Sequence, residues 1–258
     1  MKYILFKEEE GVATLTFNRP SKYNSVNQGM AFEIQERLDY IASNNAIRAV
    51  VITGAGKAFC AGQDLAEVVD PEGPELRDIV SKHYNPIIQK ITQLNRPVLA
   101  AVNGVAAGAG ANIALNCDIV VAKKSASFIQ AFSKIGLIPD SGGTYILPRL
   151  IGYQKALAVA LLGDKISAVE AEKLGMLYRV YEEEDFDTSV QSLAERLAQM
   201  PTYGLALTKQ AFQLGQNQSL EDQLIIEGHL QTLAGNSEDY KEGVNAFLEK
   251  RKPIFKGF

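Results

Sequence analysis

Apolar residues alternate with polar ones over residues 11–17, where Ala13, Leu15 and Phe17 are separated by two threonines. A period of two is typical of a half-buried strand, and a turn rich in acidic residues and glycine separates it from an equally short segment at 2–7. The two segments therefore predict a pair of strands. Three further strands, covered on both faces, are predicted from short continuous apolar runs at residues 49–53, 97–102 and 119–122.

Helical periodicity separates these strands. Residues 28–43 place Met30, Ile34 and Leu38 on one stripe, and residues 75–94 repeat apolar positions at spacings of three and four. A run of glycine and alanine leads into a third helix near residues 108–116. Strands that alternate with helices in this way predict βαβ units with right-handed crossovers, and hence the α/β class.

The pattern becomes helical after about residue 150. Pro201 separates two of the expected helices, and Ser219 stands three residues before Asp222, as in a capping box. We therefore expect a mostly helical C-terminal part. The expected helices are residues 150–162, 168–174, 186–200, 203–214, 220–234 and 239–251.

Composition narrows the class of protein. The 258 residues are 47% hydrophobic and 22% charged, which is typical of a globular protein and excludes disorder. The net charge of −4 disfavours nucleic-acid binding driven by counterion release. The N-terminus has no signal-peptide pattern, and no run approaches 18 apolar residues, so we expect a cytoplasmic protein without membrane spans.

The residues that most often carry metal or nucleophilic chemistry are scarce. Two cysteines, Cys60 and Cys117, exclude a disulfide framework or a Cys-rich zinc site, and both are expected to be buried thiols. With two histidines there is no His₃ metal site. His83 lies on the apolar stripe of the 75–94 helix, where it is either a hydrogen-bonded core residue or part of a pocket wall.

Two glycine-containing segments point to chemistry at the backbone. Phe59 to Leu65 forms a tight turn after a buried strand, and Asn103 to Asn112 leads into a helix. Glycine lets a backbone N–H approach a ligand closely, and the start of a helix offers N–H groups without partners. Together the two turns predict a pair of donors to one oxygen, which is an oxyanion hole.

At these residues the sequence resembles the crotonase superfamily, the enoyl-CoA hydratases and isomerases. The resemblance runs essentially from end to end, and the order and spacing of its motifs are highly specific. The motifs are Asn18-Arg19-Pro20, Ala61 to Leu65, Asn103 to Ala111, Cys117 to Ile119, Gly136 to Pro139, Gly142 to Thr144, Leu162-Gly163, Ala168 to Gly175 and Phe247 to Lys252.

The resemblance implies a coenzyme A thioester as substrate, with its carbonyl oxygen held by the backbone N–H groups of Gln63 and Ala109. It implies a crotonase-like spiral core of ββα units, residues 1–195, and a helical trimerisation region, residues 196–258. The expected partner is a second and third copy, as a homotrimer or a dimer of trimers, with no cofactor or metal besides the CoA of the substrate. The other positions implied to contact the substrate or CoA are Ala61, Asp64, Leu65, Gly108, Asn112, Phe132, Leu137 and, across a subunit boundary, Phe247 and Lys250.

One departure from the family decides the expected reaction. Hydratases of the family carry glutamates at the positions of Asn112 and Phe132, and neither residue here can act as an acid or base. An acid instead stands at Asp140, as in isomerase members, including those that rearrange a ring epoxide and shift Δ3 double bonds. We therefore expect an isomerase in which Asp140 moves a proton, with a pKa raised by an apolar pocket. Hydration, attack by Asp140 on the acyl group, and a non-catalytic CoA-ester binder remain as alternatives.

Overall fold

The computed structural model describes residues 2–258, and its larger sheet has six strands in the order β1-β2-β3-β5-β7-β10. β1 pairs antiparallel with β2, and every other pair in this sheet is parallel. The predicted strands are all present, and the alternation in β2 is reproduced in its burial. The strands are Ile4–Glu9 (β1), Val12–Phe17 (β2), Ala49–Gly54 (β3), Val98–Val102 (β5), Ile119–Lys123 (β7) and Arg179–Tyr181 (β10).

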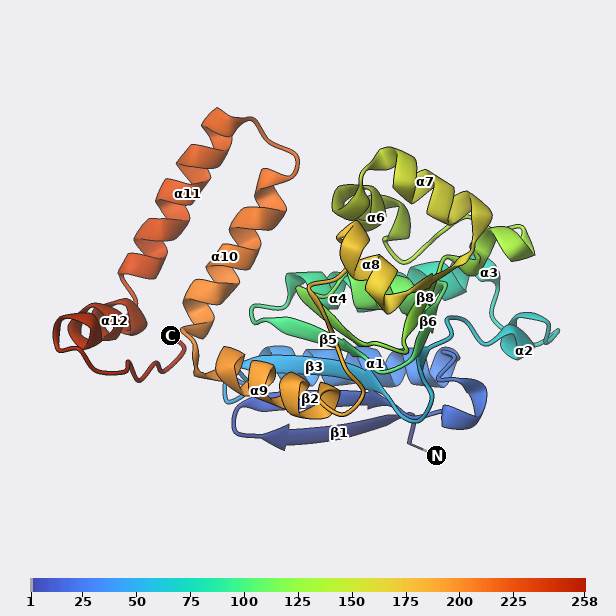
Figure 1. Ribbon diagram of the computed structural model, residues 1–258, viewed down its shortest axis with the longest axis horizontal. Coiled ribbons are helices and arrows are strands. Elements are labelled where there is room, and N and C mark those ends of the chain that lie inside the picture. Colours follow the sequence, from blue (N-terminus) through green and yellow to red (C-terminus); the bar gives the residue numbers. More distant parts are fainter. Residues whose placement is uncertain (1) are drawn as a thin grey trace.

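A smaller sheet of four strands has the order β4-β6-β8-β9. Consecutive strands alternate between the two sheets, β3 with β4, β5 with β6 and β7 with β8, and helices follow each pair (Figure 1). This confirms the spiral of ββα units. The four strands of the smaller sheet have three residues each, too few to show a hydrophobic period in the sequence. They are Ala58–Cys60 (β4), Val105–Ala107 (β6), Ser127–Ile129 (β8) and Lys165–Ser167 (β9).

Helices such as α1 and α9 bury one stripe, whereas α5 is buried on all sides. Asn27 caps the first, because its side chain accepts a hydrogen bond from the Met30 N–H at 3.0 Å. The α-helices are Gln28–Ser43 (α1), Leu65–Val68 (α2), Leu76–Asp78 (α3), Asn85–Gln93 (α4), Ala109–Leu115 (α5), Gly143–Ile151 (α6), Tyr153–Leu162 (α7), Ala168–Leu174 (α8), Phe186–Gln199 (α9), Thr202–Gly215 (α10), Leu220–Gly235 (α11) and Glu238–Leu248 (α12). Two short 3₁₀ helices lie at Pro20–Lys22 and Ala131–Ile135.

The helix predicted over 75–94 contains a π-helical segment, Ile79–Tyr84, between α3 and α4. Pro86 explains this difference, because it has no N–H to donate to the Lys82 carbonyl one turn back. The Asn85 N–H bonds to Val80 O, five residues back, and Gln35 Nε2 on α1 donates to Lys82 O at 2.8 Å. A side chain from a neighbouring helix therefore replaces the missing backbone donor.

The helix predicted over 150–162 is also divided. Gly152, with φ +79°, ends α6, and α7 begins at Tyr153.

Both cysteines are free and buried, as predicted. Burial raises the pKa of the Cys60 thiol to about 12, so this thiol is not reactive at neutral pH.

Helix α9 covers one face of the larger sheet. Its Phe186 and Ala194 belong to an apolar cluster with Val51 of β3 and Leu99 of β5. The division expected after residue 195 therefore lies within a helix that packs on the sheet along much of its length.

Helices α10 and α11 form a hairpin that extends from the sheets, and α12 lies at the open end of the hairpin, away from its turn (Figure 1). Ser219 caps α11 as predicted, accepting from the Asp222 N–H at 3.1 Å. Lys209 on α10 reaches Asp118 of the core at 2.9 Å. No helix within residues 2–258 is both long enough and apolar enough to cross a membrane.

Candidate active site

The turn after β4, residues Ala61–Leu65, is fixed by backbone hydrogen bonds to the segment before α1. Ala61 N–H donates to Tyr23 O at 3.0 Å, and Gly62 O accepts from Val26 N–H at 2.7 Å. Gly62 has φ +87°, which favours glycine. The turn is rigid, and it leaves the N–H of Gln63 free.

A second turn, at Gly108, lies against the first. Gly108 has φ +53°, and Ala109 is the first residue of α5. A methyl group added at Gly62 would lie 3.3 Å from the Ala109 nitrogen. Within residues 2–258, neither the Gln63 N–H nor the Ala109 N–H donates to a protein acceptor. Two neighbouring turns thus offer two free donors, which is what an oxyanion hole requires.

Asp140 lies on the loop before α6, and its side chain is half-buried. Burial raises the pKa of the Asp140 carboxyl, and the hydrogen bond from Ser141 Oγ to Asp140 Oδ1, 2.8 Å long, opposes part of this rise. Ser141 adopts φ +50°, an uncommon backbone conformation for a residue with a side chain. The direction of the pKa shift is the one predicted for a carboxylate that accepts a proton near neutral pH.

Asn112 connects α5 to the Asp140 loop. It is fully buried, and its Nδ2 donates to Asp140 O at 2.8 Å while its Oδ1 accepts from Gln130 Nε2 at 2.8 Å. Both ends of this amide are therefore used in holding the protein together. A direct contact of Asn112 with substrate stays a prediction.

The apolar residues expected around the acyl group differ in exposure. Phe132 is buried, and its ring lies 3.8 Å from the position of a methyl group added at Gly108, so it lies next to the second turn. Leu137 and Ile138, on the loop before Asp140, are 37% and 79% exposed. Their apolar surface is open to a ligand or to another chain.

The comparisons with known proteins identify the family. The family model described as enoyl-CoA hydratase/isomerase matches residues 7–257. The chain belongs to this family. It is 49% identical to 1,2-epoxyphenylacetyl-CoA isomerase of Escherichia coli (strain K12), over 100% of this chain and 99% of that protein. It is 44% identical to a probable enoyl-CoA hydratase of Rhodobacter capsulatus, over 98% of both.

Solved structures of the family have the same fold. The enoyl-CoA hydratase from Bacillus anthracis superposes with a TM-score of 0.95 at 33% identity, over 100% of both chains. An enoyl-CoA hydratase from Mycobacterium smegmatis gives 0.92 at 30% identity, over 98% of both chains. Both hydratase and isomerase names therefore occur among the relatives, so the reaction has to be argued from the site itself.

Asp64, expected to contact CoA, is used within the protein. Its carboxylate pairs with Arg19 at 2.7 Å, with only 13% and 14% of the two side chains exposed, and it caps α2 through the Ala66 N–H. Arg19 is a site-supporting residue that sequence reasoning did not single out, although the Asn-Arg-Pro motif contains it. The pair fixes the turn that carries Gln63. Ala61 is half-buried in the same turn, and Leu65 is 52% exposed at the start of α2.

Phe247 and Lys250 lie at and just after the C-terminal end of α12, at the opposite end of the molecule from α2 and the turn before it (Figure 1). Phe247 is 82% exposed. Within one chain these residues are remote from Gln63 and Ala109, so contact with the same CoA requires a second copy. That arrangement stays a prediction.

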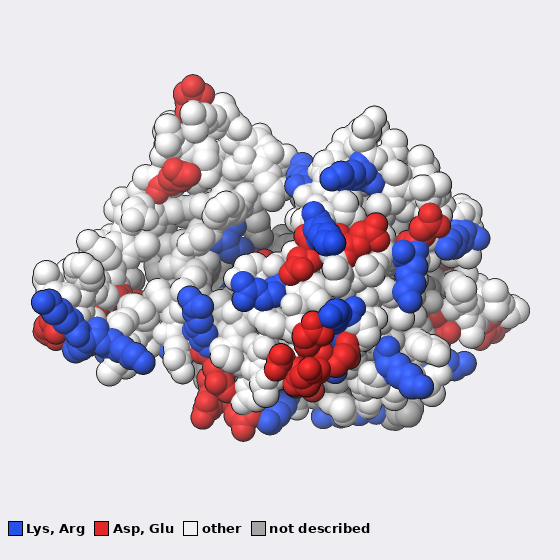
Figure 2. Space-filling model, in the orientation of Figure 1, with Lys and Arg blue, Asp and Glu red and all other residues white. Residues whose placement is uncertain are grey.

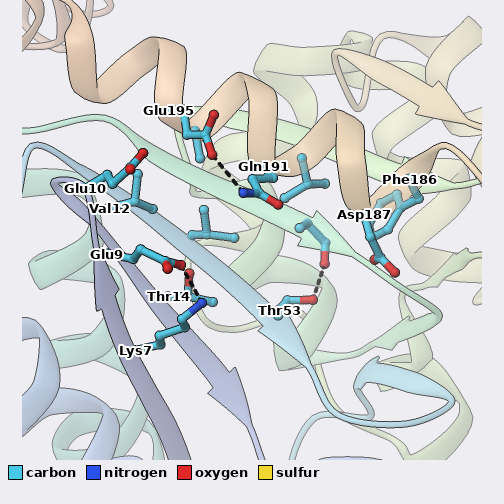
Figure 3. A pocket seen from close by; sticks show the side chains of 14 residues that line it. Lys7, Glu9, Glu10, Val12, Thr14, Thr53, Phe186, Asp187, Gln191 and Glu195 are labelled. Carbon is cyan, nitrogen blue, oxygen red and sulfur yellow. Dashed lines mark hydrogen bonds and ion pairs between the residues drawn. The ribbon is translucent and has the colours of Figure 1, made fainter.

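A cavity of about 460 Å³ lies away from this site, between the larger sheet and α9 (Figure 3). Four carboxylates line it, from Glu9, Glu10, Asp187 and Glu195, and Lys7 is paired with Glu9. More exposed acids lie nearby, and Figure 2 shows acidic side chains gathered on this face. Such a surface repels the phosphates of CoA, and none of the expected site residues lines the cavity.

Proposed function

We propose that this chain is an acyl-CoA isomerase with one acid–base residue, Asp140. The observation that carries the proposal is the pair of free N–H groups of Gln63 and Ala109, which lie in two neighbouring turns. Ala109 begins α5, the helix whose Asn112 also holds the Asp140 loop. Removal of a proton next to a thioester places negative charge on the carbonyl oxygen. Each preset donor at that oxygen lowers the barrier by about 3–4 kcal/mol.

Asp140 accepts a proton from one carbon of the acyl group and then donates a proton to another. An isomerase needs no second acid, because the carboxyl group formed in the first transfer is the acid of the second, and its proton can exchange with solvent in between. The raised pKa of Asp140 suits a group that is ionised at the start and protonated in the intermediate. Phe132 stands beside Gly108 where it limits the access of water to the intermediate.

The proposed substrate is 2-(1,2-epoxy-1,2-dihydrophenyl)acetyl-CoA, in phenylacetate catabolism, with Δ3,Δ2-enoyl-CoA isomerisation as a second activity. The support is the name of the Escherichia coli relative and its 49% identity over the whole chain. Hydration is disfavoured because Asn112 and Phe132 supply no carboxylate. The substrate carries CoA, and no separate cofactor is part of the proposal.

We also propose a trimer, or a dimer of trimers, built through the C-terminal helices. The support is the apolar surface that one chain leaves open there, which includes Phe212, Ile225, Phe247 and Leu248, each more than 70% exposed. Light scattering during size exclusion tests this, with three or six times 28.1 kDa expected. A mass of 28.1 kDa at micromolar concentration contradicts it.

Proton exchange tests the function without a guess about the product. In D₂O, the wild-type protein should place deuterium in the acyl group of the ring-epoxide thioester and of 3-hexenoyl-CoA. Asp140→Asn should bind CoA esters and lose exchange by about 10²- to 10⁴-fold, as removal of a general base predicts. Exchange that survives in Asp140→Asn contradicts the role of Asp140. Hydration of crotonyl-CoA by the wild-type protein, at a rate that matches its proton exchange, would favour the hydratase.

A further inference from the structure

The loop between Asp140 and α6 holds two consecutive residues in the left-handed region of the backbone. Ser141 has φ +50° and Gly142 has φ +74°. Glycine adopts this conformation freely, but a residue with a side chain does so at a cost and keeps it only where the surrounding structure holds it. Asp140 comes directly before these two residues, so the groups that hold the loop also set the position of the proposed base.

No side chain from another element orients the Asp140 carboxylate. Within residues 2–258 its one side-chain hydrogen bond comes from the neighbouring Ser141 Oγ, at 2.8 Å. Ser141 is itself buried, so the direction of the carboxylate follows the backbone at Ser141. A base in an active site is normally oriented by a further group. Here that group has to act on the backbone of the loop.

Helix α5 contacts this backbone through two asparagines one turn apart. Asn112 Nδ2 donates to Asp140 O at 2.8 Å, and Asn116 Nδ2 donates to Ser141 O at 3.1 Å. Residues four apart lie on the same face of a helix, and Asn116 is the residue at which α5 ends. Two successive turns of α5 therefore hold two successive carbonyl groups of the loop.

Asn116 is the sole donor to its carbonyl. Asp140 O also accepts from the Gly143 N–H, whereas no other group within residues 2–258 donates to Ser141 O. The side chain of Asn116 is fixed, because its Nδ2 also donates to Asn112 O, one turn back, at 2.8 Å. The loop thus depends on this one amide at the residue whose conformation is costly.

The loop lies directly on the two amides. A methyl group added at Gly142 would lie 3.0 Å from Asn116 Nδ2, and one added at Gly143 would lie 2.3 Å from Asn112 Nδ2. The two glycines let the backbone approach closely enough for both hydrogen bonds. The asparagines of α5 and the glycines of the loop therefore form one matched contact.

We propose that Asn116 is a positioning residue for the proton transfer, which holds Ser141 in its left-handed conformation and thereby holds the Asp140 carboxylate in place. This inference rests on the proposed function and adds a residue to that same site. Asn116 acts through the backbone of the loop and touches neither the carboxylate nor the substrate. Without its donor, Ser141 relaxes to a negative φ, and the Asp140 side chain turns with it.

Two variants separate the hydrogen bond to the loop from the one within α5. Asn116→Ala removes both. In Asn116→Ser the hydroxyl still donates to Asn112 O, as serines in helices do, but it is too short to reach Ser141 O. Both variants should lose kcat by about tenfold or more, because the base is displaced, while the Kd of an acyl-CoA stays within about twofold. Asn116→Ser should be the more stable of the two in thermal unfolding.

Asn44→Ala is the matched control. Asn44 ends α1 as Asn116 ends α5, and its side-chain nitrogen donates to Glu8 and Tyr40 instead of the Asp140 loop. This change should keep the wild-type kcat, whatever it does to the Tm. A kcat within twofold of wild type in Asn116→Ala or Asn116→Ser overturns the inference, and so does an equal loss of kcat in Asn44→Ala.

A crystal structure of Asn116→Ala tests the same point without turnover. Ser141 should have a negative φ, and the Asp140 carboxylate should lie more than about 1 Å from its wild-type position. An unchanged loop overturns the inference, whatever reaction the protein catalyses. Failure of the proposed function shows elsewhere, as deuterium exchange that is absent in the wild type or kept in Asp140→Asn.

Discussion

Asn112 donates from its side-chain nitrogen to the backbone oxygen of Asp140 across 2.8 Å. Asn112 belongs to α5, and the first residue of that helix, Ala109, carries one of the two free N–H groups. One helix therefore connects a proposed donor of the oxyanion hole to the proposed base. The chemistry depends on this relation, because proton transfer requires the acceptor within hydrogen-bond reach of the carbon that loses its proton.

Substitution of Asn112 should lower kcat through the position of Asp140. Asn112→Ala leaves Gln130 Nε2 without a partner and removes one of the two hydrogen bonds to Asp140 O, which still accepts from the Gly143 N–H. With the cavity that it creates, the change should cost about 2–4 kcal/mol of stability. We expect kcat to fall at least about tenfold. Denaturant unfolding and steady-state kinetics with one acyl-CoA measure the two effects.

The isosteric variant Asn112→Asp separates position from charge. It brings a second carboxylate near Asp140, which raises the pKa of Asp140, whereas Asn112→Ala adds no charge. The acidic limb of the kcat/KM profile should move to higher pH in Asn112→Asp alone. An equal profile in both variants would place Asn112 outside the environment of the base.

Loss of the Ser141 hydroxyl should also move the pH profile. The hydrogen bond to Asp140 Oδ1 favours the charged carboxylate, so Ser141→Ala removes a contribution that lowers its pKa. A base acts when ionised, hence activity rises with pH through this pKa, and a higher pKa moves the limb to higher pH. Ser141→Gly removes the same hydroxyl and also relieves the φ of +50°. The two variants should share one pH profile, with Ser141→Gly the more stable in thermal unfolding.

The alternation of apolar positions predicts β2, and the helical stripe predicts α1, because each element buries one regular face. The three-residue strands of the smaller sheet have no such pattern and are held by pairing with distant strands, as β4 is with β6. The π-helical segment follows from Pro86 together with Gln35, which lies 47 residues before Lys82. Only the fold brings Gln35 next to Lys82.

In the candidate site, the glycines of the sequence predicted the two turns at Gly62 and Gly108. Both residues have a positive φ, which disfavours residues with a side chain, and at Gly62 a neighbouring backbone also lies too close for one. For His83 the sequence left two alternatives, a hydrogen-bonded core residue or part of a pocket wall. The side chain is buried in the core, but neither nitrogen has a hydrogen-bond partner within residues 2–258, so the first alternative is wrong about the hydrogen bond. Pairs such as Arg19 with Asp64 are not readable from sequence, because 45 residues separate them and many charged residues are equally available.

The Arg19–Asp64 ion pair should contribute to stability far more than a surface pair does. Asp64→Asn keeps an oxygen to cap α2 and leaves the Arg19 guanidinium without its carboxylate in a buried place. We expect a loss of about 3 kcal/mol in the free energy of unfolding, together with a higher KM because the turn of Gln63 loosens. Asp78→Asn, which breaks the exposed pair with Lys82, is the control and should change neither quantity measurably. Equal losses in the two variants would contradict the supporting role of Arg19.

His83 should make the protein less stable as the pH falls. Burial lowers its pKa below 6.5, which outweighs the opposing effects of Glu67 and Asp78, while Lys82 lowers it further. The unfolded chain therefore binds a proton that the folded chain does not, from about pH 7 down to the folded pKa, and stability is lost across that window. For one proton the slope is at most about 1.4 kcal/mol per pH unit.

His83→Phe should remove this slope and keep the packing against Phe32. Denaturant unfolding at pH 7 and pH 5 measures it: the difference between the two pH values should be smaller in His83→Phe than in the wild type. His229→Gln, at an exposed position on α11, is the control and should keep the wild-type difference. If His83→Phe retains the full wild-type loss of stability, then other groups cause that loss and the role assigned to His83 is wrong.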